Sequence, residues 1–281
     1  MTFGKKEVDL LSLTLFFSFC RTITMAQLYE AKDIIVILGA VPQEITLLIN
    51  QLENGEQKQL WGIPYWQGQL QNKSVVLAIT GIGKTFTGMT STLFIKEFQP
   101  RLVLMTGTGA RINAQLRTGD VIVATHTYEH DYGSLTASNE MVYRSMNSAD
   151  DGKEVLNEFQ PSASMLTIAL KAIESYPTQT IVVDDEISYE NQVRFGVVAS
   201  SDLFGVPQVR IDLLRNHFRA DIMEMESGPL GLVCQTFGVP YLIVRSGSNI
   251  AQEAPNDDYL RLSPIAAREA AKFLLHLLKF L

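Results

Sequence analysis

Two acidic residues and an arginine follow apolar segments in the last third of the chain. Met223-Glu-Met-Glu226 ends one apolar run, and Arg245 follows a second, Tyr241-Leu-Ile-Val. Open α/β sheets bind ligands just beyond the carboxyl ends of their strands. Carboxylates there can accept hydrogen bonds from vicinal hydroxyls and favour nearby positive charge. Glu224, Glu226 and Arg245 are therefore candidate site residues, and the alternative is a pair of solvated strand ends.

Two glycine-containing segments have the same placement after an apolar run. They are Thr80-Gly-Ile-Gly-Lys84 and Thr106-Gly-Thr-Gly-Ala110. Glycine lets bare backbone approach a ligand closely, which makes Gly109 a candidate substrate contact. The first segment lacks the spacing of a phosphate-binding Walker loop, and the second lacks the third glycine of a dinucleotide loop. Each alone is more often a tight strand-to-helix turn than a site.

These residues sit in a regular alternation of Val/Ile-rich runs and helix-period segments. Such alternation predicts an α/β fold with a largely parallel sheet and helices on its faces. Residues 129–160 break the alternation and are predicted to form a long excursion near the site or a lid. Strands are predicted at 34–39, 74–80, 101–106, 120–126, 195–200, 221–225 and 240–245, and helices at 42–53, 84–98, 163–175, 208–218, 227–237 and 264–280.

Composition excludes several classes of function. The 281 residues are 46% hydrophobic and 19% charged, with a net charge of −7 and no Lys/Arg cluster, which argues against a nucleic-acid partner. Cys20 and Cys234 are far apart, so neither a disulfide framework nor a zinc site is indicated. His126 and His130 are four residues apart, but a metal site at this spacing needs a helix, and Val121–Thr127 is predicted to be a strand, which argues against a metal site.

The first 26 residues form a distinct segment. Lys5 and Lys6 precede an apolar run, and Thr24-Met-Ala26 resembles a cleavage site, so residues 1–26 are predicted to be a signal peptide of an exported or periplasmic protein. The alternative is a cytoplasmic chain that starts at Met25. No stretch reaches the roughly 18 apolar residues that a transmembrane helix needs, so no membrane association is expected.

Taken together, the motifs resemble one family. Their order along the chain is similar to that of the nucleoside phosphorylase superfamily, and within it to the 5′-methylthioadenosine/S-adenosylhomocysteine nucleosidases. The resemblance implies a three-layer α/β/α sandwich around a mixed, partly barrel-like sheet, with residues 27–281 as a single domain. It also implies a small-molecule purine nucleoside as substrate, no cofactor, no metal and a homodimer. The motifs are Gly39–Glu44, Thr80–Lys84, Thr106–Ala110, Thr118–Val121, His130-Asp131, Met223–Glu226 and Val244–Asn249.

The resemblance also assigns roles on the ribose and base side of the site. Cleavage of an N-glycosidic bond passes through a ribose with oxocarbenium character, which carboxylates can stabilise. Glu226 matches the glutamate that binds the ribose hydroxyls, Met225 packs against the sugar, and Glu224 matches a second carboxylate near it. Phe204 matches the aromatic residue that stacks on the purine, with core packing as the alternative.

Glu44 matches the nucleosidase glutamate that orients and deprotonates the attacking water. The resemblance gives Arg245 and Thr80 as helpers at that water. Phosphorylases of the superfamily carry an arginine in this loop to bind phosphate, whereas this chain has Pro42-Gln-Glu44, whose negative charge repels phosphate. Hydrolysis is therefore expected rather than phosphorolysis.

Asn249 departs from the nucleosidase pattern, which has an aspartic acid that donates a proton toward purine N7. An amide does not transfer a proton in the ordinary sense, but it can donate to an oxygen at purine C6 and accept from N7–H. We therefore treat Asn249 as a catalytic candidate with three readings open. These are a methylthioadenosine-type nucleosidase, a 6-oxopurine nucleosidase for futalosine or inosine, and a nucleoside-binding or storage protein that is a weak enzyme or none.

Overall fold

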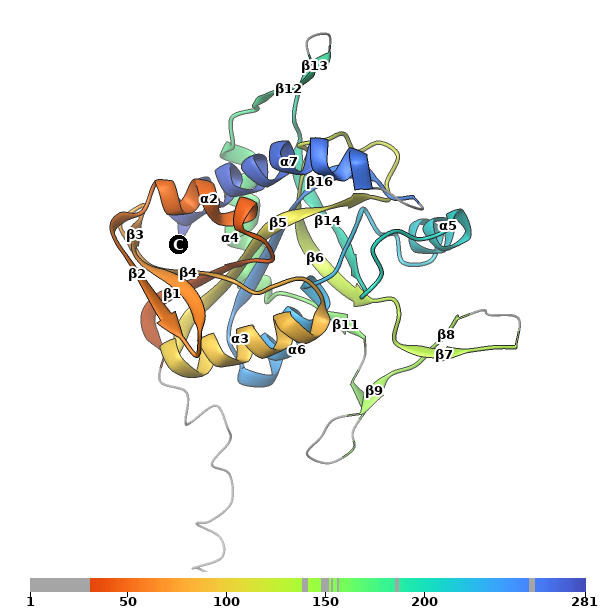
Figure 1. Ribbon diagram of the computed structural model, residues 1–281, viewed down its shortest axis with the longest axis horizontal. Helices are drawn as coiled ribbons and strands as arrows, with labels where there is room; N and C mark the ends of the chain where they lie inside the picture. Colours follow the sequence, from red (N-terminus) through yellow and green to blue (C-terminus); the bar gives the residue numbers. More distant parts are fainter. Residues whose placement is uncertain are drawn as a thin grey trace, which may run out of the picture. The chain divides into compact units, whose positions relative to one another are not determined.

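Ten strands of the described chain join one mixed sheet (Figure 1). The computed structural model describes residues 31–137, 141–147, 152, 154–155, 157–184, 187–252 and 256–281. The predicted signal peptide lies outside these residues. The strands of this sheet are β1 (Lys32–Gly39), β2 (Glu53–Leu60), β3 (Ile63–Leu70), β4 (Lys73–Ile79), β5 (Pro100–Arg111), β6 (Val121–Glu129), β11 (Glu158–Phe159), β14 (Val193–Ser200), β15 (Ile222–Glu224) and β16 (Tyr241–Ile250).

One half of the sheet closes on itself. The order is β11-β6-β14-β15-β5-β1-β4-β3-β2, and β16 bridges the gap by pairing with both β5 and β6. The pairs β1–β4, β1–β5, β14–β15, β6–β14 and β5–β16 are parallel, whereas β5–β15 and β6–β16 are antiparallel. The resulting partial barrel brings the ends of β5, β15 and β16 together.

Helices cover both faces of the sheet, as the sequence predicts. Helices α2 (Pro42–Asn50), α4 (Ala163–Ser175) and α7 (Asn256–Leu277) form one layer, and α3 (Lys84–Phe98) and α6 (Ser227–Phe237) form the other (Figure 1). Helix α5 (Gln208–Asn216) packs near β14 and β15 over a small cluster that includes Ile211, Leu214 and Met223. The three-layer arrangement confirms the predicted fold class.

Burial explains why these segments form their elements. The side chains of β1 from Ile35 to Leu38 are fully buried, as expected for a strand covered by helices on both faces. They join a core that α7 completes with Phe273 and Leu274. Residues 31–281 form one compact unit. None of the helices in the described part of the chain is long and apolar enough to span a bilayer.

Four features differ from the sequence predictions. One is the antiparallel pair of β12 (Thr180–Asp184) and β13 (Ile187–Glu190), where no strand was predicted. Residues 53–70 form the antiparallel pair β2–β3, which the sequence did not predict. Helix α7 begins at Asn256 rather than at 264 and contains Pro264. The excursion 129–160 holds short strands, β7 (Gly133–Leu135), β8 (Met141–Tyr143), β9 (Met146–Asn147) and β10 (Glu154–Val155), before β11 returns to the sheet beside β6. Its predicted action as a lid stays a prediction.

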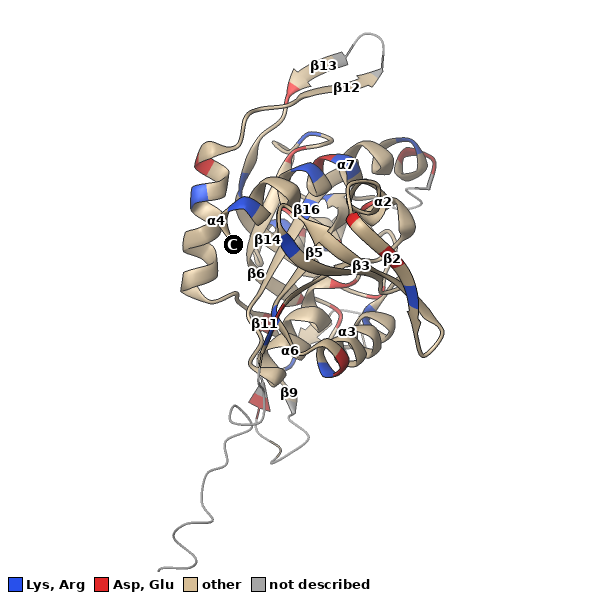
Figure 2. Cartoon of the chain, turned by 90° about the vertical axis from the view of Figure 1, so that its left-hand side faces the viewer, with Lys and Arg blue, Asp and Glu red and all other residues tan. Residues whose placement is uncertain are grey.

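Basic and acidic residues are interspersed over the described elements. Figure 2 shows Lys and Arg spread over several helices and strands, with Asp and Glu among them. This distribution is consistent with the absence of a basic cluster in the sequence. Within the described ranges, no group of three His, Cys, Asp or Glu side chains is arranged to hold a metal ion.

Candidate active site

A cavity of about 330 Å³ opens where the ends of β5, β15 and β16 meet the N-termini of α2 and α7. This volume lies in the range of roughly 300–1,000 Å³ that is typical of small-molecule sites. Seven of the nine predicted site residues line it. They are Glu44, Phe204, Gly109, Glu224, Met225, Glu226 and Asn249.

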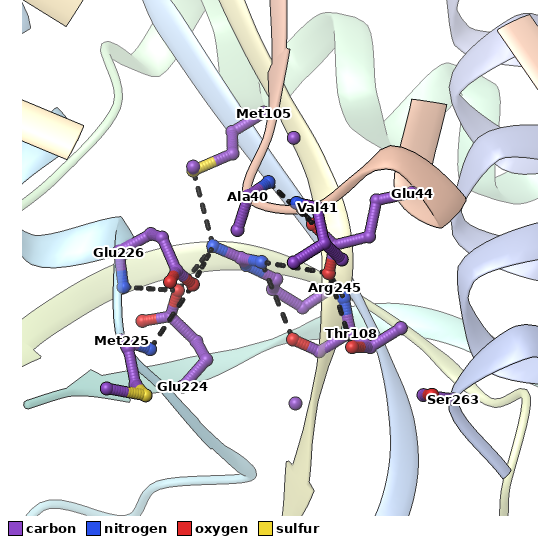
Figure 3. A network of polar contacts seen from close by, with 12 residues as sticks. Ala40, Val41, Glu44, Met105, Thr108, Glu224, Met225, Glu226, Arg245 and Ser263 are labelled. Carbon is purple, nitrogen blue, oxygen red and sulfur yellow. Dashed lines mark hydrogen bonds and ion pairs between the residues drawn. The ribbon is translucent and has the colours of Figure 1, made fainter. Parts of the chain in front are cut away.

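Arg245 lies beneath the cavity and joins its carboxylates (Figure 3). Its Nη2 contacts Glu224 Oε2 and lies 3.2 Å from Glu226 Oε2, and its Nη1 lies 3.9 Å from Glu44 Oε1. The guanidinium is fully buried, and this single cation faces all three carboxylates. These carboxylates raise the pKa of Arg245 against the opposing effect of burial. The cavity floor is therefore negative in total.

Glu44 is fixed by the turn that connects β1 to α2. Pro42 begins α2, where a missing N–H costs nothing, and Glu44 is the third residue of the helix. Glu44 Oε2 accepts from the N–H of Ala40 at 2.6 Å and more weakly from Val41, and Oε1 accepts from the N–H of Thr108 at 2.8 Å. The carboxylate thus links the helix N-terminus to β5 and stays on the cavity wall.

Glu224 is held by donors from β14, from the start of α6 and from β16. Its oxygens accept from the N–H groups of Glu226 and Ser227, from the Ser200 hydroxyl and from Arg245. The two backbone donors are unpaired N–H groups of the first turn of α6. Glu224 therefore caps α6 and orients Arg245, in addition to lining the cavity.

Glu226 occupies the N-cap position of α6 and reaches across to α3. Its Oε1 accepts from the Gly83 N–H at 3.1 Å, and its Oε2 contacts Arg245. Burial raises the pKa of Glu226, Arg245 opposes this rise, and the neighbouring Glu224 adds to it. This carboxylate has fewer donors than Glu224 and faces the cavity, so a diol can complete its hydrogen bonds.

Asn249 lies at an irregular point near the end of β16. The register of β16 against β5 shifts between Gly247 and Ile250, and such bulges re-aim side chains at active sites. Asn249 Oδ1 lies 3.0 Å from the Ser248 hydroxyl, and Nδ2 donates to the carbonyl of Ile250 at 3.0 Å. An amide nitrogen carries two N–H groups, so one remains for a ligand.

Phe204 forms part of the opposite wall, in the loop between β14 and α5. Its ring is 53% exposed, which does not fit the alternative that it packs in the core. It meets Tyr259 of α7 edge to face, with centroids 5.4 Å apart. Burial raises the pKa of Tyr259, and Glu44 adds to the rise.

Two predicted residues do not line the cavity. Arg245 contacts its carboxylates from below. Thr80 is buried beside Gly39, and its hydroxyl donates to the carbonyl of Gly81 at 2.7 Å. The structure thus gives Thr80 a role in the turn after β4 and no place on the cavity wall.

Sequence reasoning missed several residues that the structure brings to the site. Thr108 holds Glu44, and its motif was noted without a role for the threonine itself. Ser200 and Ser227 hold Glu224 and lie next to predicted strand and helix ends. Tyr259 carried no signal, because the last helix was expected to begin at 264.

A glycine inside β5 makes the approach of Arg245 to Glu44 possible. A Cβ on Gly107 would lie 2.2 Å from Arg245 Nη1 and 2.7 Å from Glu44 Oε1. Similarly, a Cβ on Gly109 would lie 2.3 Å from the Ile222 side chain. The repeated glycines of the segment 106–110 therefore serve close packing around the charged cluster.

Known proteins share this architecture. A nucleosidase from Lysinibacillus sphaericus, specific by name for 5′-methylthioadenosine and S-adenosylhomocysteine, is 26% identical over 242 residues, which cover 86% of this chain and 96% of that one. A Helicobacter pylori nucleosidase of the same name, solved as an aspartate-to-asparagine mutant with 5′-methylthioadenosine in its active site, superposes with a TM-score of 0.73 at 28% identity, covering 89% of this chain and all of that one.

The futalosine hydrolase of Helicobacter pylori is also similar, with a TM-score of 0.73 and 28% identity over 89% of this chain and 98% of that one. The sequence model described as the phosphorylase superfamily matches residues 34–279. This match spans both sides of the cavity, from β1 to α7, and confirms the family predicted from the motifs. The chain belongs to the phosphorylase superfamily.

Proposed function

We propose that the protein is a purine nucleosidase that hydrolyses the N-glycosidic bond of 5′-methylthioadenosine or S-adenosylhomocysteine. The observation that carries the proposal is the convergence of Glu226, Glu44 and Asn249 on one cavity from three separate elements. The nucleosidases that the chain resembles support it over most of their length.

In the proposed reaction Glu226 binds the ribose diol, because a carboxylate accepts from two adjacent hydroxyls. In its ionised form it also stabilises the positive character that develops on the sugar in the transition state. Glu44 orients the attacking water and takes its proton as the water bonds to the anomeric carbon and the bond from that carbon to the purine breaks. The departing purine takes up a proton from water, because the amide of Asn249 does not transfer one. Arg245 keeps the carboxylates in place. The purine stacks on Phe204, and Asn249 faces the imidazole edge or the six-membered edge of the purine.

Hydrolysis rather than phosphorolysis is favoured by the charge of the cavity. Three carboxylates face one guanidinium, and that guanidinium is fully buried beneath them. A phosphate dianion would be repelled at this wall, whereas water is not. Added phosphate is therefore expected to leave the rate of base release unchanged.

A 6-oxopurine nucleoside is the second candidate substrate, and Asn249 is the observation that favours it. One N–H of its amide is used by Ile250, and the other can donate to an oxygen at purine C6. The structural similarity to a futalosine hydrolase is consistent with this alternative.

The decisive experiment measures release of free adenine and hypoxanthine from methylthioadenosine, adenosylhomocysteine, futalosine and inosine, with and without phosphate. Adenine release independent of phosphate supports the main proposal. Faster hypoxanthine release favours the second candidate. Measurable nucleoside binding without base release from any substrate would contradict both and favour a binding or storage protein.

We further propose that the protein is a homodimer. Ile82, Phe86 and Met89 form an apolar stripe at and beyond the start of α3, and their side chains are 55%, 56% and 46% exposed. Exposed apolar patches of this kind are typical of protein–protein interfaces. Light scattering should give twice the chain mass. Phe86→Glu should give a monomer, whereas Leu170→Glu on α4 should not.

A further inference from the structure

Phe204 lies in the loop between β14 and α5. Leu203, Phe204 and Gly205 line the cavity, yet the Leu203 and Phe204 side chains are largely exposed. The ring of Phe204 meets Tyr259 and leaves a face for a ligand. A base stacks on Phe204 with higher affinity when the loop is held in place beforehand, because less conformational entropy is lost on binding.

Asp202 fixes this loop from outside the cavity. Its Oδ1 accepts from the backbone N–H of Lys84 at 2.7 Å, and its own N–H donates to Asp131 Oδ2 at 2.9 Å. Asp202 is not among the residues that line the cavity. Its carboxylate therefore acts on the framework of the loop and does not reach the ligand site.

The partner of Asp202 is the N-terminus of α3, which also holds Glu226. Gly83 donates its N–H to Glu226 Oε1, and the next N–H, that of Lys84, goes to Asp202. Gly83 has a φ of 94°, a conformation that favours glycine, and a Cβ there would lie 2.9 Å from Asp202 Oδ1. Two successive N–H groups at the start of α3 thus connect Glu226 with the loop that carries Phe204.

The Lys84 side chain completes the connection. Its Nζ lies 2.6 Å from Asp131 Oδ1 and 3.2 Å from Glu129 Oε2. Both carboxylates are mostly buried at the end of β6. Burial opposes a rise in the pKa of Lys84, but its bonds to Asp131 and Glu129 raise it. Asp131 is therefore held by Lys84 on one oxygen and holds the loop with the other.

We propose that Asp202 is a positioning residue that determines affinity for the base by fixing Phe204 relative to Glu226. The part concerning the base rests on the proposed function. The expected signature is a change in KM without a matching change in kcat, since Asp202 contacts neither the sugar nor the water. The rise in KM on removal of Asp202 should also disappear when Phe204 is replaced by a residue without a ring.

The test compares Asp202→Ala with Asp202→Asn, which keeps an acceptor oxygen for the Lys84 N–H. Loss of a hydrogen bond to a charged group predicts a rise in KM of roughly tenfold for Asp202→Ala, with kcat changed by less than about twofold. Asp202→Asn should restore part of the affinity. Asp33→Ala removes an exposed acid from the start of β1 and should leave KM unchanged.

A double-mutant cycle separates positioning from a general loss of structure. In a Phe204→Ala background, Asp202→Ala should raise KM by less than about twofold further. An equal rise in both backgrounds, or an unchanged KM in Asp202→Ala, overturns the inference. If Asp202→Ala does not fold, the same comparison with Asp202→Asn decides.

Hydrogen–deuterium exchange tests the structural part without any turnover. Amides of residues 202–206 should exchange faster in Asp202→Ala than in the wild type. If the wild type cleaves no nucleoside, the proposed function fails, and the exchange result still shows whether Asp202 holds the loop. Unchanged exchange in this segment would contradict the inference, whatever the activity.

Discussion

At the residue scale, the site is organised by one buried cation with three acidic partners. Arg245 alone does not neutralise Glu44, Glu224 and Glu226, so each carboxylate needs additional N–H or hydroxyl donors. Glu44 obtains them from the start of α2 and from Thr108, and Glu224 obtains them from α6 and Ser200. Glu226 has the fewest, which leaves it free to bind hydroxyls.

Glu44→Gln tests the assignment of water activation. An amide keeps most of the shape but does not take a proton, so kcat should fall by about 10²-fold or more. Nucleoside affinity, measured by calorimetry, should change by less than about threefold, because the diol and the base are bound elsewhere. Losses of equal size in turnover and affinity would assign Glu44 a binding role instead.

Asn249→Asp tests the missing proton donor. A positioned general acid is worth roughly 10²–10⁴ in rate, so restoring a carboxyl should raise adenine release from methylthioadenosine at least tenfold. Asn249→Ala, which offers neither a proton nor a hydrogen bond, is the matched control and should show no gain. An unchanged or lower rate in Asn249→Asp would place the donor on another group.

Whether a site residue could be predicted from the sequence depends on the element that carries it. Residues at the ends of apolar strands, such as Glu224 and Arg245, could be identified because the strand pattern marks them. Tyr259 could not, since it reaches the cavity only through the first turn of a helix whose start was misplaced. Thr80 also ends a strand, but its hydroxyl bonds to its own turn, and the sequence does not distinguish these cases.

At the element scale, β5 shows how a strand must be built to let a charged cluster form beside it. Gly107→Ala would place a methyl group against Arg245 and Glu44 and is expected to cost about 1–3 kcal/mol of unfolding free energy. Gly88→Ala is the matched control. Gly88 lies inside α3 with nothing within 4 Å of an added Cβ, so alanine should stabilise the protein by about 0.5–1 kcal/mol.

Denaturant unfolding of both variants measures these changes directly. Activity should be lost in Gly107→Ala and kept in Gly88→Ala. A Gly107→Ala variant that is as stable and active as the wild type would show that Arg245 and Glu44 do not need this close approach.

Most helices and buried strands could be predicted, because their periodicity is set by burial. Helices α3, α4 and α6 have the predicted bounds, and β1 and β4 differ by two residues or fewer. The pair β2–β3 was missed because β2 is polar and exposed along nearly its whole length, so no apolar alternation marks it. The predicted start of helix α7 lay too far along the chain, because proline is expected at a helix start, whereas Pro264 lies inside the helix.

At the scale of the whole molecule, the family resemblance supplied what periodicity did not. Alternating strands and helices predict a largely parallel sheet, but the closure of β16 onto both β5 and β6 depends on pairings between segments more than 100 residues apart. No local pattern encodes such pairings. The family resemblance implied them, because its members share a mixed, partly barrel-like sheet.

Stability of the whole molecule should depend on pH through His130. This residue is fully buried at the end of β6, and within the described chain neither ring nitrogen has a hydrogen-bond partner. Burial, with Arg210 nearby, lowers the pKa of His130 to about 4. The unfolded chain takes up a proton below about pH 6.5, whereas the folded protein does not until about pH 4. Stability is therefore lost as the pH falls through this window and is fully present above it.

Urea unfolding of the wild type and of His130→Asn at several pH values checks this effect. As the pH falls from 6.5 to 4, the free energy of unfolding of the wild type should decrease by up to about 1.4 kcal/mol per pH unit more than that of the variant. The total difference should be roughly 3 kcal/mol. Between pH 7 and 8 the two curves should run parallel, because His130 is neutral in both the folded and the unfolded state. Parallel curves below pH 6.5 as well would mean that the folded protein binds this proton as readily as the unfolded chain.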